Sequence, residues 1–187
     1  MTVKLVLCGD GAVGKTAVRQ RYLGQGFSTN YMQTMGANFA GKYLELPKTE
    51  KNPIGLVRLQ IWDLAGQPSF EKVRSKFYTG THGALLIFDV TRPESFENMV
   101  NWLAELLKYN EYLVPTILVG NKVDLRGEVD NTISLEQGQA LAEVIASEYA
   151  QSKFPPLYIE TSAKTGQNID DSFQKVTEVA LEHFLDA

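Results

Sequence analysis

The sequence has little of what marks a secreted, membrane-spanning or nucleic-acid-binding protein. Its single cysteine, Cys8, excludes an intramolecular disulfide and fits a reducing compartment. No uninterrupted apolar run approaches the ~20 residues of a membrane span, and the N-terminus has no signal-peptide pattern. Acidic residues outnumber basic ones by 22 to 18, so we expect no attraction to nucleic acid or anionic lipid. A length of 187 residues fits one domain, 1–187, which we expect to be cytoplasmic.

Histidine is also scarce, and the C-terminal segment contains no cysteine. There are two histidines, His82 and His183, and we expect both to be structural or exposed rather than catalytic. The last residues, EHFLDA, contain no cysteine, so we expect no prenyl group and no membrane anchor in the chain as given. Contact with membranes would then depend on partners or on a missing lipidated tail. Cys8 itself is expected to be a small core residue.

Apolar runs of strand length alternate with longer stretches of helical period. Strands are predicted at 3–8, 37–46, 56–63, 84–89, 116–120 and 157–160. Strands that alternate with helices indicate an α/β fold in three layers, with helices on both faces of a six-stranded, mostly parallel sheet. The loop PKTEKNPIG joins the second and third strands without a helix, so that pair is expected to be antiparallel. Ligands of such sheets bind at the carboxyl ends of the strands.

Helical stretches fill the gaps between these strands. One is predicted at 15–23 and another at about 134–151. Two more have apolar residues at helical spacing: Phe96, Val100, Leu103 and Leu107 in the first, and Ile169, Phe173, Val176, Ala180 and Phe184 in the second. The sequences TRPE, 91–94, and SLEQ, 134–137, have the spacing of capping boxes that open helices.

The segment GDGAVGKT, Gly9 to Thr16, follows the first strand and opens a helix. It matches G-x-x-x-x-G-K-[ST], a pattern whose backbone N–H groups and helix N-terminus bind phosphate. Lys15 would reach the terminal phosphates and the Thr16 hydroxyl would bind Mg²⁺. A glycine-rich turn that only caps a helix is the alternative. The motif alone does not separate a GTPase from an ATPase or a small-molecule kinase.

The segment NKVD, 121–124, follows the fifth strand. The Asp124 carboxylate could accept two hydrogen bonds from guanine, whereas adenine offers no such donor pair. Asn121 could bond the base and tether the phosphate loop, and the stem of Lys122 could cover a ring face. An ordinary polar turn after a strand is the alternative.

The segment ETSAKTG, 160–166, follows the sixth strand. Here the Ala163 N–H could meet guanine O6 while Ser162 braces the turn, although a plain polar loop is the more common explanation. Phe27 lies in an otherwise polar loop and could cap the edge of the base. A core anchor for that loop is its alternative.

With the phosphate loop, DLAGQ, NKVD and SAK in this order on these strands, the chain resembles small GTPases of the Ras superfamily. It is most similar to the Rab and Ras-like branches, as IWDLAGQ, LVGNKVDL and FYTGTHGALLIFDVTRPESFENMVNWL indicate. The resemblance covers Val3 to about Leu185. It implies a P-loop G domain that binds GTP and GDP with Mg²⁺ and slowly hydrolyses GTP, as a molecular switch.

The resemblance also implies roles for matching positions. Gln67 would be the catalytic residue, because it would position the attacking water. Thr16, Thr34 and Asp63 would bind Mg²⁺, the last through water. The residues expected to bind nucleotide are Gly9, Asp10, Gly11, Ala12, Val13, Gly14, Lys15, Thr16, Ala17, Phe27, Thr34, Gly66, Asn121, Lys122, Asp124, Ser162, Ala163 and Lys164.

Partners implied by the resemblance are effectors, an exchange factor and a GTPase-activating protein. Effectors would bind two switch segments, about 27–46 and 62–78. Phe70, Phe77 and Tyr78 are expected to be exposed anchors for them, with packing between helix and sheet as an equal alternative. We find no arginine in a convincing position to assist hydrolysis, so turnover would be slow without the activating protein. We expect a monomer.

The chain departs from the family pattern at Pro68, where Rab-like chains usually have glutamate. Proline costs little in the first turn of a helix, and it biases the preceding Gln67 toward extended backbone. We expect Pro68 to restrict the loop that presents Gln67 rather than to abolish catalysis, and a side chain at Gly11 would crowd the same space. The loop 47–55 is longer than the family's tight turn. The alternative to a hydrolysing switch is a nucleotide-bound Rab-like scaffold with negligible turnover.

Overall fold

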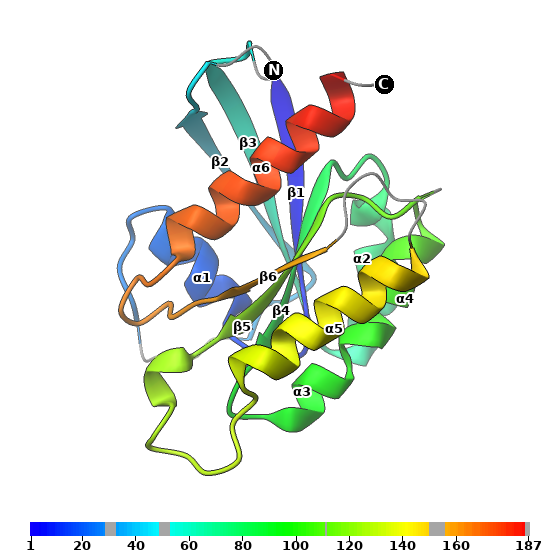
Figure 1. Cartoon of the computed structure of the whole chain (residues 1–187). Coiled ribbons are helices and arrows are strands. Elements are labelled where there is room, and N and C mark those ends of the chain that lie inside the picture. The colour runs from blue at the N-terminus through cyan, green and yellow to red at the C-terminus, as the bar shows by residue number, and fades with distance from the viewer. Residues whose placement is uncertain (29–32, 49–52, 111, 150–155, 186–187) are drawn as a thin grey trace.

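One six-stranded sheet organises the chain. The computed structural model describes residues 1–28, 33–48, 53–110, 112–149 and 156–185. The strands are β1 (Thr2–Cys8), β2 (Ala37–Glu45), β3 (Leu56–Leu64), β4 (Gly83–Asp89), β5 (Thr116–Asn121) and β6 (Leu157–Glu160). They lie in the order β2-β3-β1-β4-β5-β6 (Figure 1). Because β2 and β3 are antiparallel and the other neighbours are parallel, the predicted sheet and its one antiparallel pair are confirmed.

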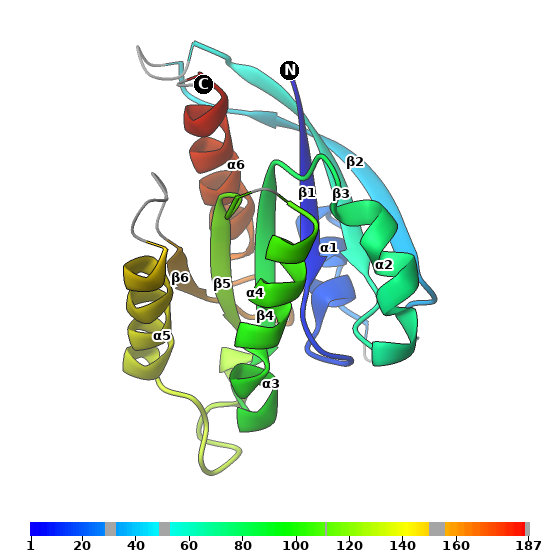
Figure 2. The ribbon, with the colours of Figure 1, turned by 90° about the vertical axis from the view of Figure 1, so that its right-hand side faces the viewer.

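Helices cover both faces of this sheet, as expected. α1 (Lys15–Tyr22) and α6 (Ile169–Leu185) lie on one face. The other face carries α2 (Glu71–Tyr78), α3 (Pro93–Glu97), α4 (Met99–Lys108) and α5 (Leu135–Glu148), as Figures 1 and 2 show. Two short 3₁₀ turns, η1 (Pro68–Phe70) and η2 (Val123–Leu125), follow β3 and β5. No helix in the described ranges is both long and apolar enough to cross a membrane.

Each layer boundary has its own apolar core, because successive strand residues point to opposite faces. Leu5 and Leu7 of β1 pack toward α1 and α6. Val6 and Cys8 pack toward the other helices, so the expected core position of Cys8 is confirmed. Burial raises the pKa of the Cys8 thiol to about 12.

The helix predicted from the spacing of Phe96, Val100, Leu103 and Leu107 differs from its sequence pattern. It is two helices, since α3 ends at Glu97 and α4 begins at Met99. A helical period counted across this junction therefore misplaces the buried face. Val100 is 52 % exposed, and the buried positions of α4 are Met99, Trp102, Leu103 and Leu106.

One of the two predicted capping boxes is wrong. The Thr91 hydroxyl donates to Asp89 Oδ1 at 2.7 Å, and α3 begins one residue later, after Arg92, without a side-chain cap. The buried acceptor Asp89 thus competes successfully for the threonine. The other box is confirmed, because Gln137 N donates to Ser134 Oγ at 3.2 Å and Gln137 Oε1 accepts from Ser134 N at 2.8 Å.

The two histidines make structural contacts. His82 Nδ1 accepts a hydrogen bond from the Lys4 backbone N–H at 2.7 Å, and its ring packs edge-on against Phe184. His183 packs against Tyr112. Both contacts fit the structural role expected from the sequence.

Candidate functional site

The carboxyl ends of the parallel strands meet at one edge of the sheet, where the four motifs follow β1, β3, β5 and β6. A cavity of about 490 Å³ lies there. Its lining residues are Gly11, Ala12, Gly14, Lys15, Thr16, Ala17, Gln20, Phe27, Ser28, Thr34, Leu64, Gly66, Gln67 and Lys122. The fold therefore brings most of the predicted phosphate, metal and catalytic residues to one place.

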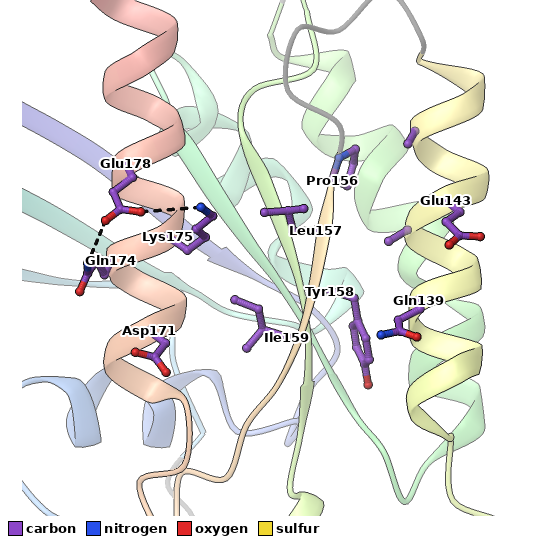
Figure 3. Close-up of a pocket in the computed structure, with 12 residues that line it drawn as sticks. Gln139, Glu143, Pro156, Leu157, Tyr158, Ile159, Asp171, Gln174, Lys175 and Glu178 are labelled. Atoms are coloured by element: carbon purple, nitrogen blue, oxygen red, sulfur yellow. Dashed lines mark hydrogen bonds and ion pairs between the residues drawn. The ribbon is translucent and has the colours of Figure 1, made fainter. Parts of the chain in front are cut away.

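A larger cavity, of about 840 Å³, lies beside β6 between α5 and α6 (Figure 3). Leu157 and Ile159 point toward α6, and Tyr158 points toward α5. None of the predicted site residues lines this cavity. The motifs, and not cavity size, locate the candidate site.

The phosphate loop requires its glycines for conformation and for space. Gly9 and Gly14 have φ values of 140° and 100°, and a Cβ at Gly14 would collide with the Asn121 amide. Gly66, from the loop after β3, approaches the loop so closely that a Cβ there would collide with the backbone of Asp10 and Gly11. Glycine at these positions lets two loops touch through their backbones.

Lys15 lies buried beneath this loop. Its ammonium donates to the carbonyl oxygens of Gly9 and Asp10 at 2.6 and 2.7 Å. Burial lowers the pKa of Lys15 to about 8. The group is therefore mainly protonated at neutral pH, and an anion in the cavity would find a buried cation.

Three oxygen-bearing side chains meet next to Lys15. The Thr16 hydroxyl donates to Asp63 Oδ2 at 2.6 Å and lies 3.0 Å from the Thr34 hydroxyl. The second carboxylate oxygen, Asp63 Oδ1, is buried and accepts no hydrogen bond from the described residues. Burial raises the pKa of Asp63, while the hydrogen bond from Thr16 and the charges of Lys15 and Arg19 oppose that shift.

This donor set fits Mg²⁺. The described residues contain no group of three or more His, Cys, Asp or Glu that could bind a metal. Mg²⁺ needs no such group, because it commonly takes one or two carboxylates together with waters and substrate phosphates. Two hydroxyls and one carboxylate with a free oxygen provide protein ligands of that kind.

Asn121 ties three motifs together. Its Nδ2 donates to Val13 O at 3.0 Å, which confirms the predicted tether to the phosphate loop. Its Oδ1 accepts from the Thr161 hydroxyl at 3.1 Å and from the Ala163 N–H at 3.2 Å. The Ala163 N–H predicted for guanine O6 is thus paired within the protein here.

Lys122 precedes the turn η2 after β5, and Asp124 lies within it. Lys122 has a φ of 68°, and its ammonium donates to Ala12 O at 2.9 Å and pairs with the buried carboxylate of Asp89 at 2.7 Å. Asp124 Oδ1 accepts from the Ser162 hydroxyl, while Lys164 lies 3.8 Å from Asp124 Oδ2. Since Ser162 Oγ also accepts from Thr165 N at 3.1 Å, its predicted bracing role is confirmed.

Two residues of the phosphate loop, Asp10 and Val13, could meet a nucleotide only through their backbones. The Asp10 carboxylate points away from the cavity and accepts hydrogen bonds from Asn98 and Trp102, while Val13 lies in the core. Phe27 is 43 % exposed and lines the cavity. The alternative of a core anchor is therefore wrong for Phe27.

Gln67 and Pro68 take the conformations expected from the sequence. Gln67 has extended backbone, with φ −76° and ψ 143°, and Pro68 is the first residue of η1. Gln67 Oε1 is buried and accepts no hydrogen bond from the described residues. A Cβ at Gly11 would lie 3.4 Å from Gln67 Nε2, so anything beyond a methyl group would crowd the amide.

The aromatic anchors predicted after Gln67 need correction. Tyr78 is fully buried, and its hydroxyl donates to Glu105 at 2.8 Å. Phe77 is partly buried against Trp62, with ring centroids 4.9 Å apart. Of the two alternatives for Tyr78, the structure therefore shows packing, because its side chain faces Glu105 of α4 and not solvent. Phe70 is half-buried.

Two arginines contact the site although no sequence motif predicted that they would. Arg92, after β4, donates to Gly11 O at 3.0 Å, and its Nε lies 3.9 Å from Asp89. Arg74, seven residues after Gln67, donates to two backbone carbonyls of the loop that carries Gln67. Neither belongs to one of the four nucleotide-binding motifs, so residue spacing did not predict these contacts.

Known proteins are similar to this chain over nearly its whole length. A profile of the Ras family matches residues 4–182. The Ras-related protein RABG3b of Arabidopsis thaliana is 38 % identical over 96 % of this chain and 83 % of its own length. The Ras-related protein Rab-2B of Dictyostelium discoideum is 33 % identical over 96 % and 80 %. The GTP-binding protein ypt2 of Schizosaccharomyces pombe is 34 % identical over 99 % and 84 %. The chain belongs to the Ras family.

Proposed function

We propose that this protein is a guanine-nucleotide switch that binds GTP and GDP with Mg²⁺ and slowly hydrolyses GTP. One observation carries the proposal: Lys15, Thr16, Thr34 and Gln67, which come from three separate segments, line one cavity, and Asp63 bonds Thr16 beside it. The similarity to a protein named as GTP-binding supports the choice of nucleotide.

Lys15 would act on the β- and γ-phosphates. In the structure its donors are satisfied by Gly9 O and Asp10 O. Phosphate oxygens would be stronger acceptors for the same ammonium, since charge-assisted hydrogen bonds exceed those to neutral carbonyls. The N–H groups of Gly9 to Ala17 and the N-terminus of α1 would complete the anion site.

Thr16, Thr34 and Asp63 would hold Mg²⁺. The metal would neutralise charge that develops on the phosphates. In the protein these side chains bond one another, so they are oriented toward a common point. Asp63 would take part through its second oxygen, which accepts no hydrogen bond from the described residues, and a water could lie between it and the metal.

The base would lie beside Asn121, Lys122, Asp124, Ser162, Ala163 and Lys164. Asp124 would accept from guanine, and the Ser162 hydroxyl and Lys164 ammonium already fix the direction of its carboxylate. An adenine would leave that carboxylate unpaired, which is costly in a desolvated site. Phe27, exposed at the cavity, would cover an edge of the base.

Gln67 would orient the attacking water. Its buried Oε1 accepts no hydrogen bond from the described residues, and its Nε2 lies near Gly11. Phosphoryl transfer to water requires alignment and charge stabilisation more than covalent help. Arg92 is engaged with Gly11 O and Asp89, so an activating protein that supplies an arginine would accelerate turnover by roughly 10³–10⁵-fold.

The same contacts would make the protein a switch. Thr34 and Gly66 could touch a γ-phosphate only while it exists, so its loss would alter both segments. Effectors, an exchange factor and an activating protein would read segments 27–46 and 62–78. We propose that the protein acts as a monomer in the cytoplasm and reaches membranes through partners or through a lipidated tail outside the given sequence.

The test is multiple-turnover hydrolysis of GTP by the purified protein with Mg²⁺, compared with Gln67→Leu. Leucine keeps the volume but removes the amide, so the rate should fall at least about tenfold, or ~1.4 kcal/mol in the barrier. GDP affinity should stay unchanged. Equal rates in the two proteins would remove Gln67 from its role, and ATP competing as well as GTP would remove guanine specificity.

A nucleotide-bound scaffold with negligible turnover is the alternative. Phosphate release from GTP-loaded protein, measured with and without cell lysate, separates the two. The switch releases phosphate in both cases and faster with lysate. A scaffold keeps its GTP in both.

A further inference from the structure

Arg74 of α2 holds the backbone on both sides of Gly66. One guanidinium nitrogen, Nη1, donates to Ala65 O at 2.9 Å and to Gln67 O at 2.7 Å. The side chain is only 3 % exposed. A buried guanidinium placed on two carbonyls of one short loop restricts where that loop can lie.

Glu105 of α4 fixes this guanidinium from the opposite side. Arg74 Nε and Nη2 donate to the two carboxylate oxygens of Glu105, both at 2.8 Å, in a bidentate pair. The Tyr78 hydroxyl donates to the same carboxylate at 2.8 Å. Burial opposes the charge, but the hydrogen bonds and charge of Glu105 raise the pKa of Arg74, so it stays ionised.

Trp102, one turn before Glu105 on α4, connects the same cluster to the phosphate loop. The Arg74 guanidinium lies over its ring, 4.6 Å from the centroid. The indole N–H of Trp102 donates to Asp10 Oδ1 at 2.7 Å, and Asn98 Nδ2 donates to Asp10 Oδ2 at 2.8 Å. One helix, α4, therefore contacts both the phosphate loop and the arginine that holds the Gln67 backbone.

We propose that Arg74, Glu105 and Trp102, which we name the α4 clamp, position Gln67 for hydrolysis. The clamp fixes the Gln67 carbonyl, and with it the backbone from which the side-chain amide reaches Gly11. Arg74 is a positioning residue, because it touches Gln67 and not the cavity where the nucleotide would bind. The inference rests on the proposed role of Gln67.

Positioning of this kind matters because hydrolysis by alignment is sensitive to small displacements. A shift of about 1 Å in an aligning group can cost 10²-fold in rate. Pro68 restricts the backbone of Gln67 as its neighbour in sequence, and the α4 clamp restricts it through the hydrogen bond from Arg74 to Gln67 O. Neither contact should affect affinity for GDP, since neither Pro68 nor Arg74 lines the cavity that would hold the nucleotide.

The test replaces Arg74 by lysine, which keeps the charge but cannot form the fork that reaches a carboxylate and two carbonyls together. Single-turnover GTP hydrolysis should fall about tenfold, a loss smaller than the 10²-fold of a full 1 Å displacement. Affinities for GDP and for a non-hydrolysable GTP analogue should stay within about twofold. Arg58→Lys, an exposed arginine on β3, is the matched control and should hydrolyse GTP like the parent.

Glu105→Gln gives a second variant with the same volume and no charge. It should fold like the parent and keep one oxygen acceptor for Arg74. Because a neutral hydrogen bond is weaker than a charge-assisted one, the rate of GTP hydrolysis should fall about threefold, less than in Arg74→Lys. A fall in melting temperature for both variants with unchanged hydrolysis would overturn the proposal and leave the clamp purely structural. A parallel loss of affinity and rate would overturn it as well.

Amide exchange separates failure of this inference from failure of the proposed function. In Arg74→Lys the amides of Ala65 to Gln67 should exchange about tenfold faster than in the parent, with the β1 amides unchanged. If the parent hydrolyses no GTP, the proposed function fails whatever the exchange shows. If the parent hydrolyses GTP and Arg74→Lys exchanges and hydrolyses like it, only the clamp is refuted.

Discussion

Two segments reach the proposed nucleotide, and the protein holds them very differently. Segment 33–36 touches the site through Thr34, whose hydroxyl lies 3.0 Å from that of Thr16, while its neighbour Met35 is 82 % exposed. Segment 64–67 begins with buried Leu64 and Ala65, and Arg74 bonds two of its carbonyls. The first segment is attached by this hydroxyl pair, next to which Mg²⁺ would bind, and by one backbone hydrogen bond from Ala65 N to Gly36 O at 2.8 Å. The second is held in addition by the ion pair of Arg74 with Glu105.

This difference teaches that the two segments need not respond equally to the nucleotide. A segment whose contacts go mainly to the ligand is ordered only when the ligand is right. A segment fixed by an internal cluster keeps its place and changes its contacts locally. We therefore expect segment 33–36 to carry the larger nucleotide-dependent change, and segment 64–67 to carry the catalytic geometry.

Amide exchange with GDP and with a non-hydrolysable GTP analogue is the most direct test of this difference between the two segments. The amides of 33–36 should exchange at least about tenfold faster with GDP, because Thr34 loses its ligand. Those of 64–67 should change less than about threefold, because the α4 clamp persists. Equal changes in both segments would show that the clamp does not hold segment 64–67 independently.

Thr34→Ala tests the weaker attachment from the protein's side. Removal of the hydroxyl should weaken binding of the GTP analogue in the presence of Mg²⁺ by roughly fivefold, or ~1 kcal/mol, and leave GDP binding unchanged. Titration with the two nucleotides, with Mg²⁺ and with a chelator, measures this. Thr34→Ser keeps the hydroxyl and should bind like the parent. An equal loss for GDP would contradict a contact that depends on the third phosphate.

Pro68→Glu tests the stronger attachment and should have the smallest effect. Glutamate frees the φ of position 68 and the backbone of Gln67, but Arg74 still bonds Gln67 O. GTP hydrolysis should stay within about threefold of the parent, while exchange at Gln67 quickens slightly. Pro68→Ala frees the same backbone without adding a charge and is the control for the charge of glutamate. A large gain in rate would mean that the proline keeps Gln67 away from its working position.

The sequence predicted the parts of the site whose chemistry repeats at fixed spacing. The phosphate loop, Asp63, Gln67 and the Asn121 tether all lie where the motifs place them. These succeed because backbone conformation and strand order determine them locally.

Contacts between distant segments could not be predicted in this way. Arg74 and Glu105 are 31 positions apart, and their pairing depends on how α2 and α4 pack. Whether Tyr78 is exposed also depends on how α2 packs against α4, where its hydroxyl meets Glu105. Val100 was wrongly predicted to be buried, because the break between α3 and α4 turns the buried face. A local acceptor, Asp89, also took Thr91 from its expected cap.

The buried thiol of Cys8 makes the comparison of the two segments accessible to direct labelling. With a pKa of about 12 and no exposure to solvent, it has almost no thiolate at neutral pH to react with alkylating reagents. A cysteine introduced in place of exposed Met35 would then be the one reactive thiol of the chain. A dye or spin label attached there would follow the movement of segment 33–36 without first removing a native cysteine.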